Sequence, residues 1–389
     1  MDTYTNIIVV GAGISGLSVA LHLTEISADF LLVDPTPGQG ASHVAAGMLA
    51  PASEVNYDED LMGALLRKAA RYWEDFSKKV ESLTNSESGY ERRPTMLIAT
   101  ERGDLDELIR LEGYHRHLNI ESHLLGRLEA RDTEPTLSPK VIGGLYTPMD
   151  FQVDNRKLLK SLVELFDSRK QIFRSAVTSV SKNGKGSGWT VQTQDGNRIS
   201  GQFVILCNPM DAPKELLPSS LDEKLLRFIT SRAVKGDILR LRDQMDQGPK
   251  VCVRSIRNGR WNYIVPRQSH EIVVGATQEE SSQRTHLSAK AGSVLDLLFD
   301  ATSSIPILRE LSLVEVGTGL RPGTFDNYPL VGELLPGLYI HSGHYRHGFL
   351  LAPITAAALV SSLAPEPQAQ DEAILVDFSS IMSPYRFQL

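Results

Sequence analysis

Three glycines near the start of the chain have the spacing of a phosphate-binding turn. Gly11, Gly13 and Gly16 lie between an apolar run at 6–10 and a stripe of apolar residues with helical spacing. In such a turn the first glycine permits the tight bend, the second lets a pyrophosphate approach the backbone, and the third lets helix and strand pack closely. The helix that follows would offer its N-terminal N–H groups to phosphate oxygens. The pattern therefore predicts a dinucleotide site.

An acidic residue completes this pattern. Asp34 ends a second apolar run, 30–33, and stands 18 residues after Gly16, where a carboxylate can accept hydrogen bonds from ribose hydroxyls. Its charge would repel a 2′-phosphate, which disfavours NADP and leaves FAD and NAD open. The alternatives are a turn that serves packing alone and a simple strand-ending acid, and the order of strand, turn, helix, strand and acid argues against both.

These residues require a strand–turn–helix–strand unit, and the sequence predicts further elements after it. Helices are expected at 60–83, 103–117, 156–166, 288–303 and 350–363. Strands are expected at 95–100, 172–180, 189–193, 203–206 and 337–343. Alternating runs between 232 and 276 favour an antiparallel sheet, and 364–373 is expected to be a polar linker or tail.

Composition limits the class of protein. The chain has 389 residues, 41% of them hydrophobic, and a formal net charge of −7, which argues against a nucleic-acid surface. It has two cysteines, which we expect to be buried free thiols. The first residues lack the features of a signal peptide, and no apolar run is long enough for a spanning helix, so we expect a cytoplasmic protein without a membrane span.

Three further segments carry recognisable motifs. The first, 41–51, is rich in small residues and contains AAGMLAP. The second joins GLRP at 319–322 to Asp326 and to PLVG at 329–332, and the third is GHYRHGFLLAP at 343–353. In this order they resemble the D-amino-acid oxidase superfamily, and most closely its glycine oxidase branch, the ThiO-type enzymes of thiamine biosynthesis. The resemblance spans nearly the whole chain and implies FAD as the cofactor.

The resemblance also implies a fold. It is an α/β fold in which a Rossmann-like FAD-binding domain is interleaved with a substrate domain of antiparallel β-sheet plus helices. A chain of this length exceeds the size at which one hydrophobic core usually stops growing, which likewise favours two domains. We expect the FAD-binding domain at 1–88, 140–210 and 318–365, the substrate domain at 89–139 and 211–317, and a C-terminal tail at 366–389.

In this family the third segment passes under the flavin ring, and the N-terminus of its following helix stabilises negative charge on the ring. Val177 matches a position whose backbone meets the adenine, the alternative being an ordinary strand residue. The residues that the resemblance places at a non-covalently bound FAD are Gly11, Gly13, Ile14, Ser15, Gly16, Asp34, Ser42, Ala46, Gly47, Met48, Val177, His344, Tyr345, Arg346, Gly348, Phe349 and Leu350.

The catalytic residues implied by the resemblance are Arg321, Tyr263, Arg346 and Gln278. Arg321, in GLRP, matches the arginine whose guanidinium binds a substrate carboxylate with two parallel hydrogen bonds. Tyr263 matches a tyrosine that hydrogen-bonds the same carboxylate, with sheet packing as its alternative. Arg346 matches a second arginine near flavin and substrate, or is structural. His344 contacts the flavin or orients its loop, because hydride transfer from a neutral amine needs no enzymic base.

Two histidine patterns invite other chemistry. His43 lies four residues before Gly47, whereas the flavin-linked histidines of some relatives lie three before the glycine, so a covalent link is not expected. His341, His344 and His347 recur every third residue, but strand-to-loop geometry should scatter them. No carboxylate partner is evident, and we therefore expect no metal site.

Three positions depart from the family pattern. Relatives carry an Ala-Gly turn where this chain has 207–210, Cys-Asn-Pro-Met, and proline supplies neither a positive φ nor an N–H. Gln278 replaces an apolar methionine beside the substrate, and Trp261 is larger than its counterpart. These departures affect the substrate more than the cofactor.

The activity implied is oxidation of glycine or a similar small primary or secondary amino acid. Hydride passes from Cα to flavin N5, the imine hydrolyses, and O₂ is reduced to H₂O₂. The alternatives are a dehydrogenase with another acceptor, a flavoprotein that modifies a residue of a partner protein during its maturation, and a scaffold that retains FAD. Relatives also suggest a homo-oligomer.

Overall fold

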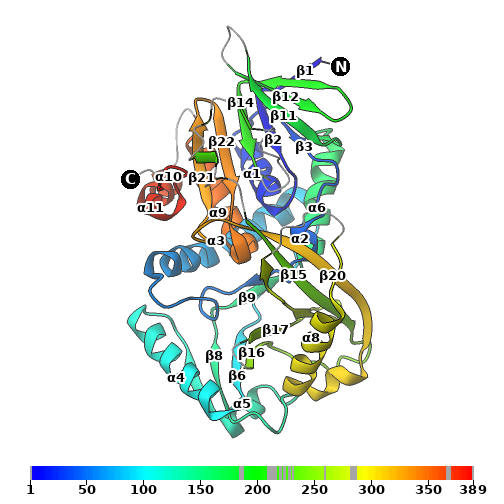
Figure 1. The fold of residues 1–389 in the computed structure, drawn as a ribbon, viewed down its shortest axis with the longest axis vertical. Helices are drawn as coiled ribbons and strands as arrows, with labels where there is room; N and C mark the ends of the chain where they lie inside the picture. The colour runs from blue at the N-terminus through cyan, green and yellow to red at the C-terminus, as the bar shows by residue number, and fades with distance from the viewer. Residues whose placement is uncertain are drawn as a thin grey trace.

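The computed structural model describes residues 2–183, 188–207, 232–257, 260–280, 287–364 and 369–387, together with a few residues between 217 and 229. Two large sheets, one in each half of the molecule, organise the fold (Figure 1). The departure expected at 208–210 falls outside the described residues, and Cys207 is described.

The glycine turn belongs to a mostly parallel sheet. Its six strands run in the order β10 (Ile172–Phe173), β3 (Phe30–Val33), β2 (Ile7–Val10), β14 (Phe203–Leu206), β22 (Leu338–Ser342) and β21 (Leu330–Leu335). Neighbours are parallel except for β21, which pairs antiparallel with β22. All of β2 is buried, as a continuous apolar run predicts. With α1 (Ile14–Glu25) between β2 and β3, the strand–turn–helix–strand unit is confirmed.

A smaller sheet shares a core with the outer face of this one. Its order is β1 (Asp2–Tyr4), β13 (Arg198–Gly201), β12 (Trp189–Thr193) and β11 (Val177–Lys182). Trp189 packs there in one apolar cluster with Ile8 and Val204. The strand expected at 172–180 is therefore wrong as one element. A turn at Ser175, whose N–H donates to Phe173 O, carries the chain from β10 in one sheet to β11 in the other.

The second large sheet has nine strands. The path is β19 (Glu279–Glu280), β15 (Arg232–Arg242), β18 (Glu271–Gly275), β17 (Arg260–Pro266), β16 (Cys252–Arg257), β6 (Thr95–Ala99), β8 (Gly143–Thr147) and β7 (His123–Gly126), and β20 (Ser312–Gly323) pairs with β15. The antiparallel pairing expected at 232–276 is confirmed. β15 and β20 form a long two-stranded ladder that runs from the middle of the molecule into the lower half (Figure 1).

A three-stranded sheet lies where the two halves meet. It consists of β4 (Met48–Leu49), β9 (Phe151–Val153) and β5 (Tyr90–Glu91). β4 belongs to the AAGMLAP segment, so this pairing attaches that segment to the rest of the fold.

The helices expected at 60–83, 103–117, 156–166, 288–303 and 350–363 are present with small shifts, as α3 (Asp60–Thr84), α4 (Arg102–His117), α6 (Asn155–Ser168), α8 (Ala291–Ser304) and α9 (Gly348–Ser361). The structure adds helices that the sequence did not predict, namely α2 (Ala41–Val44), α5 (Arg127–Thr133), α10 (Ala369–Asp377) and α11 (Ser379–Met382), with 3-10 turns η2 (Pro306–Glu310) and η3 (Tyr345–His347). Asp154 caps α6 by accepting from the Lys157 N–H at 3.1 Å. The linker expected at 364–373 is wrong in its second half, because α10 begins at Ala369 and buries Ile374 against the core.

The main core fixes the start of α9. α9 is buried along nearly all its length and packs against α1 and α3. Trp73 of α3 is fully buried and its indole N–H donates to the carbonyls of Phe349 and Leu350, at 3.0 and 3.2 Å. The segment that precedes α9 is thereby held in place.

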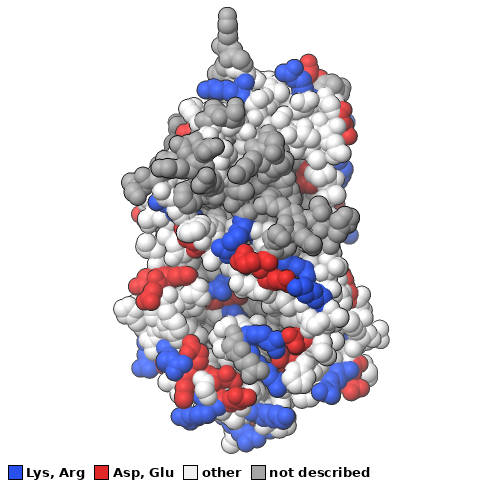
Figure 2. Space-filling view, in the orientation of Figure 1, with Lys and Arg blue, Asp and Glu red and all other residues white. Residues whose placement is uncertain are grey.

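Acidic and basic side chains lie next to one another on the face shown in Figure 2. Both cysteines, Cys207 and Cys252, are buried free thiols, as expected. Among the described residues no helix is long and apolar enough to cross a membrane.

The glycine turn generates a stability prediction. A Cβ on Gly16 would lie 1.8 Å from the Gly11 carbonyl oxygen, so Gly16→Ala must separate α1 from the turn. We expect it to lower the free energy of unfolding by about 2 kcal/mol or more and to reduce FAD retention. Urea denaturation and flavin absorbance after gel filtration measure the two effects.

Gly113→Ala is the matched control. Gly113 is an exposed position of α4, and a Cβ added there would meet nothing within 4 Å. Alanine should therefore stabilise the helix by about 0.5–1 kcal/mol. Equal stability of the two variants would contradict the close contact at Gly16.

Candidate active site

A cavity of about 470 Å³ runs from the glycine turn to the nine-stranded sheet. The residues expected from the sequence that line it are Gly13, Ile14, Ser15, Asp34, Ser42, Ala46, Gly47, Met48, Tyr263, Gln278, Arg321, His344, Tyr345, Arg346, Gly348 and Phe349. Gly11, Gly16, Val177 and Leu350 lie outside the lining. Leu350 belongs to the main core, and Val177 packs beside the cluster around Trp189.

The glycine turn has the geometry that the spacing predicts. Gly11 has a φ of 101°, a conformation that favours glycine, and the N–H of Gly11 donates to the Val33 carbonyl. A Cβ on Gly13 would lie 2.9 Å from Ser42 Oγ. Ser42 Oγ also accepts the Ile14 N–H at 3.0 Å, so one of the N–H groups at the start of α1 has a protein partner.

Asp34 lines the same end of the cavity. One carboxylate oxygen accepts the Ala12 N–H and the other accepts the Thr36 N–H, each at 2.7 Å. The two bonds orient the carboxylate between the glycine turn and the loop after β3, on the wall of the cavity.

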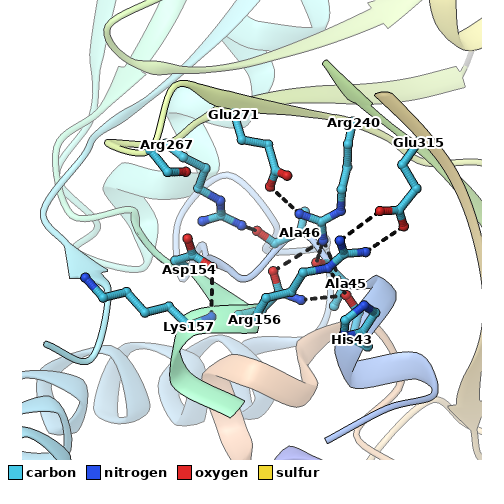
Figure 3. Close-up of polar contacts among 12 residues, drawn as sticks. His43, Ala45, Ala46, Asp154, Arg156, Lys157, Arg240, Arg267, Glu271 and Glu315 are labelled. Carbon is cyan, nitrogen blue, oxygen red and sulfur yellow. Dashed lines mark hydrogen bonds and ion pairs between the residues drawn. The ribbon is translucent and has the colours of Figure 1, made fainter. Parts of the chain in front are cut away.

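Three guanidinium groups, those of Arg240 and Arg267 buried and that of Arg156 partly buried, bind the backbone carbonyls of residues 43, 45 and 46. Arg240 Nη2 lies 3.3 Å from His43 O and 3.4 Å from Ala45 O, and Arg156 Nε donates to His43 O at 3.2 Å. Arg267 donates to Ala46 O through Nη2 and to Val153 O, at 2.6 Å, through Nη1. Figure 3 shows these side chains converging on the segment. We call Arg156, Arg240 and Arg267 the arginine clamp.

Two glutamates neutralise part of the charge of the arginine clamp. Glu271 accepts from Arg240, whose side chain is 1% exposed, and Glu315 binds both Nη atoms of Arg156, at 2.8 and 2.6 Å (Figure 3). A buried charge such as that of Arg240 is stable only when paired. Gly47 follows with a φ of 65°, and a Cβ there would lie 2.2 Å from Val153 O, so the segment also requires glycine at this point.

Arg321 and Tyr263 meet at the other end of the cavity. Arg321 extends across Gly236, where a Cβ would lie 2.3 Å from its Nη1, and Nη1 donates to Thr277 O at 3.1 Å. Tyr263 extends across Gly275 in the same way. Burial raises the pKa of Tyr263, and the nearby Arg321 opposes that shift only in part. The hydroxyl therefore stays protonated and can donate.

A charged cluster that the sequence did not reveal surrounds this pair. Arg346 Nη2 donates to Glu54 O and to Asn56 Oδ1, both at 2.9 Å. Arg254 Nη2 lies 3.6 Å from Glu54 Oε1, and the Arg254 guanidinium lies 5.1 Å from the Trp261 ring. Burial opposes ionisation of Glu54, but Arg254 and Arg346 hold its pKa below the usual value.

The expectation that His341, His344 and His347 would scatter is wrong for the first two. The rings of His341 and His344 lie 4.8 Å apart, and both Nε2 atoms lie within 3.0 Å of Thr355 Oγ1. The absence of a carboxylate partner is also wrong, because His347 Nδ1 lies 3.4 Å from Glu54 Oε2. α9 presents Thr355 to the loop before it, which brings the first two rings together. Burial lowers the pKa of His344 and of His347 to about 3, so both are neutral near pH 7.

The remaining positions singled out from the sequence also lie at or near the cavity. Gln278 lines it and is exposed, Trp261 is 36% exposed at its rim, and Cys207 lies beside Gly16 at the cofactor end. His43 lies outside the lining, and its carbonyl is bound by the arginine clamp. Glu54, Arg254 and Arg240 were missed, because nothing local in the sequence distinguishes these charged residues from solvent-exposed ones.

Comparison with known proteins identifies the class. Residues 6–362 match the FAD dependent oxidoreductase family designated DAO, and the chain belongs to this family. Its cofactor is FAD. The geometry fits, because a cavity of this size can hold much of a flat ligand between the glycine turn and the clamped segment, where Gly13 and Gly47 leave no side chain.

Individual relatives are similar along the whole chain. A bifunctional protein ThiO/ThiG from Synechocystis is 31% identical over 93% of this chain and 52% of its own length, so the chain spans about half the length of such relatives. A glycine oxidase from Geobacillus kaustophilus is 25% identical over 95% of both chains. The crystal structure of that enzyme superimposes with a TM-score of 0.80, covering 94% of this chain and 99% of the other. A glycine oxidase structure from Bacillus cereus, 24% identical, has a TM-score of 0.81 and covers 92% of this chain and 94% of its own.

The arginine clamp generates a prediction. Arg240→Met leaves Glu271 without its buried partner and the Ala45 carbonyl without a donor, so we expect a loss of about 3 kcal/mol in the free energy of unfolding and weaker FAD binding. Urea denaturation and titration of the apoprotein with FAD measure these quantities.

Arg242→Met serves as the control on the same strand. Arg242 is exposed and donates to Ser269 O at 3.0 Å, away from residues 43–46, so its loss should change stability by less than about 0.5 kcal/mol. If the two variants bind FAD equally well, the clamp does not position the cofactor segment.

Proposed function

We propose that the chain is an FAD-dependent oxidase of glycine or a similar small primary or secondary amino acid. The observation that carries the proposal is the meeting of the Arg321 guanidinium and the Tyr263 hydroxyl in one cavity with the glycine turn. The similarity to glycine oxidases along the whole chain supports it. A cytoplasmic location and a homo-oligomeric state belong to the same proposal.

Arg321 is suited to hold the substrate carboxylate. A guanidinium gives two parallel charge-assisted bonds, which fix orientation as well as position. Because one Nη atom already donates to Thr277 O and the group rests over Gly236, its direction is set before substrate binds. Tyr263 would donate a further bond to the same carboxylate, since its hydroxyl remains protonated.

FAD supplies the two-electron oxidation that converts the amine to an imine, and O₂ is reduced to H₂O₂. Water hydrolyses the imine to a 2-oxo acid and ammonia or, when the substrate is a secondary amine, a primary amine. The protein then has to hold the substrate Cα in one position relative to the cofactor. His344 and His347 are neutral and hydrogen-bonded within the fold, so neither is suited to remove a proton near pH 7. The neutral amine of the substrate is therefore the reactive form.

A second candidate is a flavoprotein that oxidises a residue of a partner protein. One observation favours it, namely that Gln278 lines both the main cavity and a smaller pocket beside Tyr328 and Asn327, so the substrate end extends outward. A dehydrogenase with another acceptor shares the same site.

The test is a peroxide-coupled screen of free amines with the FAD-loaded protein, together with anaerobic stopped-flow measurement of flavin absorbance. We expect glycine or another small amino acid to bleach the flavin and to yield H₂O₂ in air. Bleaching without H₂O₂ would favour the dehydrogenase. If no free amine bleaches the flavin, the oxidase proposal is overturned and the partner-protein alternative gains.

Arg321→Lys tests the carboxylate role. A point charge cannot reproduce the two parallel bonds, so we expect KM for the best amino acid to rise at least tenfold while FAD content stays normal. Steady-state kinetics measure this, with Arg242→Lys as a control. An unchanged KM would remove Arg321 from substrate binding.

The pKa shifts generate a pH prediction. Burial raises the pKa of Tyr263 and lowers those of His344 and His347 to about 3, so none of the three changes charge between roughly pH 6 and 9. The ratio kcat/KM should therefore rise with pH as the substrate loses its ammonium proton. The rising limb should shift when two amines of different pKa are compared. If kcat/KM rises at the same pH for both amines, the group that loses the proton belongs to the enzyme and not to the substrate.

A further inference from the structure

Arg254 is a third arginine at the substrate end of the cavity. It lies on β16 directly opposite Tyr263 of β17, and residues that pair in this way project from the same face of a sheet. Its side chain lines the cavity beside Trp261 and Glu54 and is 7% exposed. The guanidinium is thus buried and next to the pair that we propose for the α-carboxylate.

The hydrogen bonds of Arg254 are incomplete. Nη1 donates to Ser53 O and lies 3.3 Å from Ser53 Oγ. Nη2 lies 3.6 Å from Glu54 Oε1, which is longer than a hydrogen bond, and Nε is buried with no partner among the described residues. Because Nε is shielded, Nη2 is the donor that remains for an acceptor entering the cavity, since its one contact, with Glu54, is longer than a hydrogen bond.

Charge at this end of the cavity is also unbalanced. Of the described charged residues that line the cavity, Asp34 lies at the far end, and Arg254, Arg321, Arg346 and Glu54 lie here. The lining histidine, His344, is neutral because burial holds its pKa near 3. Three positive charges therefore face one negative charge. With one substrate carboxylate bound, the lining at this end would still carry one more positive than negative charge, and a second anionic group on the ligand would offset it.

The strand order separates the backbones that carry the two outer arginines. β16 and β20 are separated by four strand-to-strand steps through β17, β18 and β15, or roughly 19 Å between backbones. Arg254 and Arg321 therefore reach the cavity from different strands, and Tyr263 lies on β17 between those strands. Two arginines that start from separate strands can each bind one anionic group of a single ligand.

We infer that Arg254 forms a second anion subsite, and that the preferred substrate is a small amine bearing two acidic groups. This inference rests on the proposed function, with Arg321 and Tyr263 holding the carboxylate next to the oxidised Cα. Arg254 holds the distal acidic group, with Trp261 closing the outer wall behind the guanidinium.

The experiment compares ligands with one and two carboxylates on the FAD-loaded protein at constant ionic strength. Dissociation constants of acetate and propionate are measured against malonate and succinate by perturbation of the flavin absorbance, which needs no turnover. Glycine and sarcosine are then compared with iminodiacetate and D-aspartate in the peroxide assay. We expect the two-carboxylate ligands to bind at least tenfold more tightly, and the corresponding amines to show the higher kcat/KM.

Arg254→Met should abolish this preference, and Arg254→Lys should retain part of it because the charge remains. Arg257→Met is the matched control on the same strand, since Arg257 packs over Phe299 outside the cavity lining; the preference should be unchanged there. FAD content and melting temperature show whether each variant is folded. If Arg254→Met does not fold, the comparison of ligand affinities is made with Arg254→Lys alone.

Equal affinity for the two ligand classes, or a preference that survives in both Arg254 variants, would overturn the subsite. If glycine or sarcosine still bleaches the flavin in that case, the proposed function stands without it. If instead no amine bleaches the flavin but succinate binds better than propionate only when Arg254 is present, the subsite stands and the proposed function fails.

Discussion

The site depends on how the backbone carbonyls of residues 43, 45 and 46 are satisfied. Residues 43–46 cross from the glycine turn to the nine-stranded sheet as a partly buried segment, and carbonyls shielded from water require donors. The arginine clamp supplies them from α6, from β15 and from the end of β17, with Asn155 adding two bonds to Ser42 O and His43 O. Because guanidinium groups from the substrate-side sheet bind the cofactor-side segment, the two halves are joined at the point where the cavity passes between them.

The parts of the fold that are local in sequence could be predicted from it. The strand–turn–helix–strand unit follows from continuous apolar runs on either side of a glycine turn, since such runs are buried on both faces of a parallel sheet. The meeting of Arg321 with Tyr263 could not be derived from spacing, because β20 and β17 are brought together by a sheet whose order is not the chain order. Only the resemblance to a family indicated that Arg321 and Tyr263 bind the same substrate carboxylate.

The missed residues share a physical reason. Arg240 and Arg254 stand in alternating strands, where a charged residue ordinarily faces solvent, yet both faces of these strands are covered. Their partners, Glu271 and Glu54, lie on other elements, so neither burial nor pairing leaves a local mark. The histidines before α9 were misjudged for a similar reason, because Thr355, the residue that gathers two of them, lies a further turn into the following helix.

The bonds around Thr355 also determine which atoms carry hydrogen. Its hydroxyl donates to Leu351 O, so it can only accept from His341 and His344, and each ring must be the tautomer with hydrogen on Nε2. His341 Nδ1 is then a bare lone pair, and with the His341 carbonyl it leaves Ser15 Oγ, 2.6 Å from both, as the donor. The proton of Ser15 is thus directed into the protein. Toward the cavity this serine presents lone pairs on its side chain, and positive potential there must come from the backbone of α1.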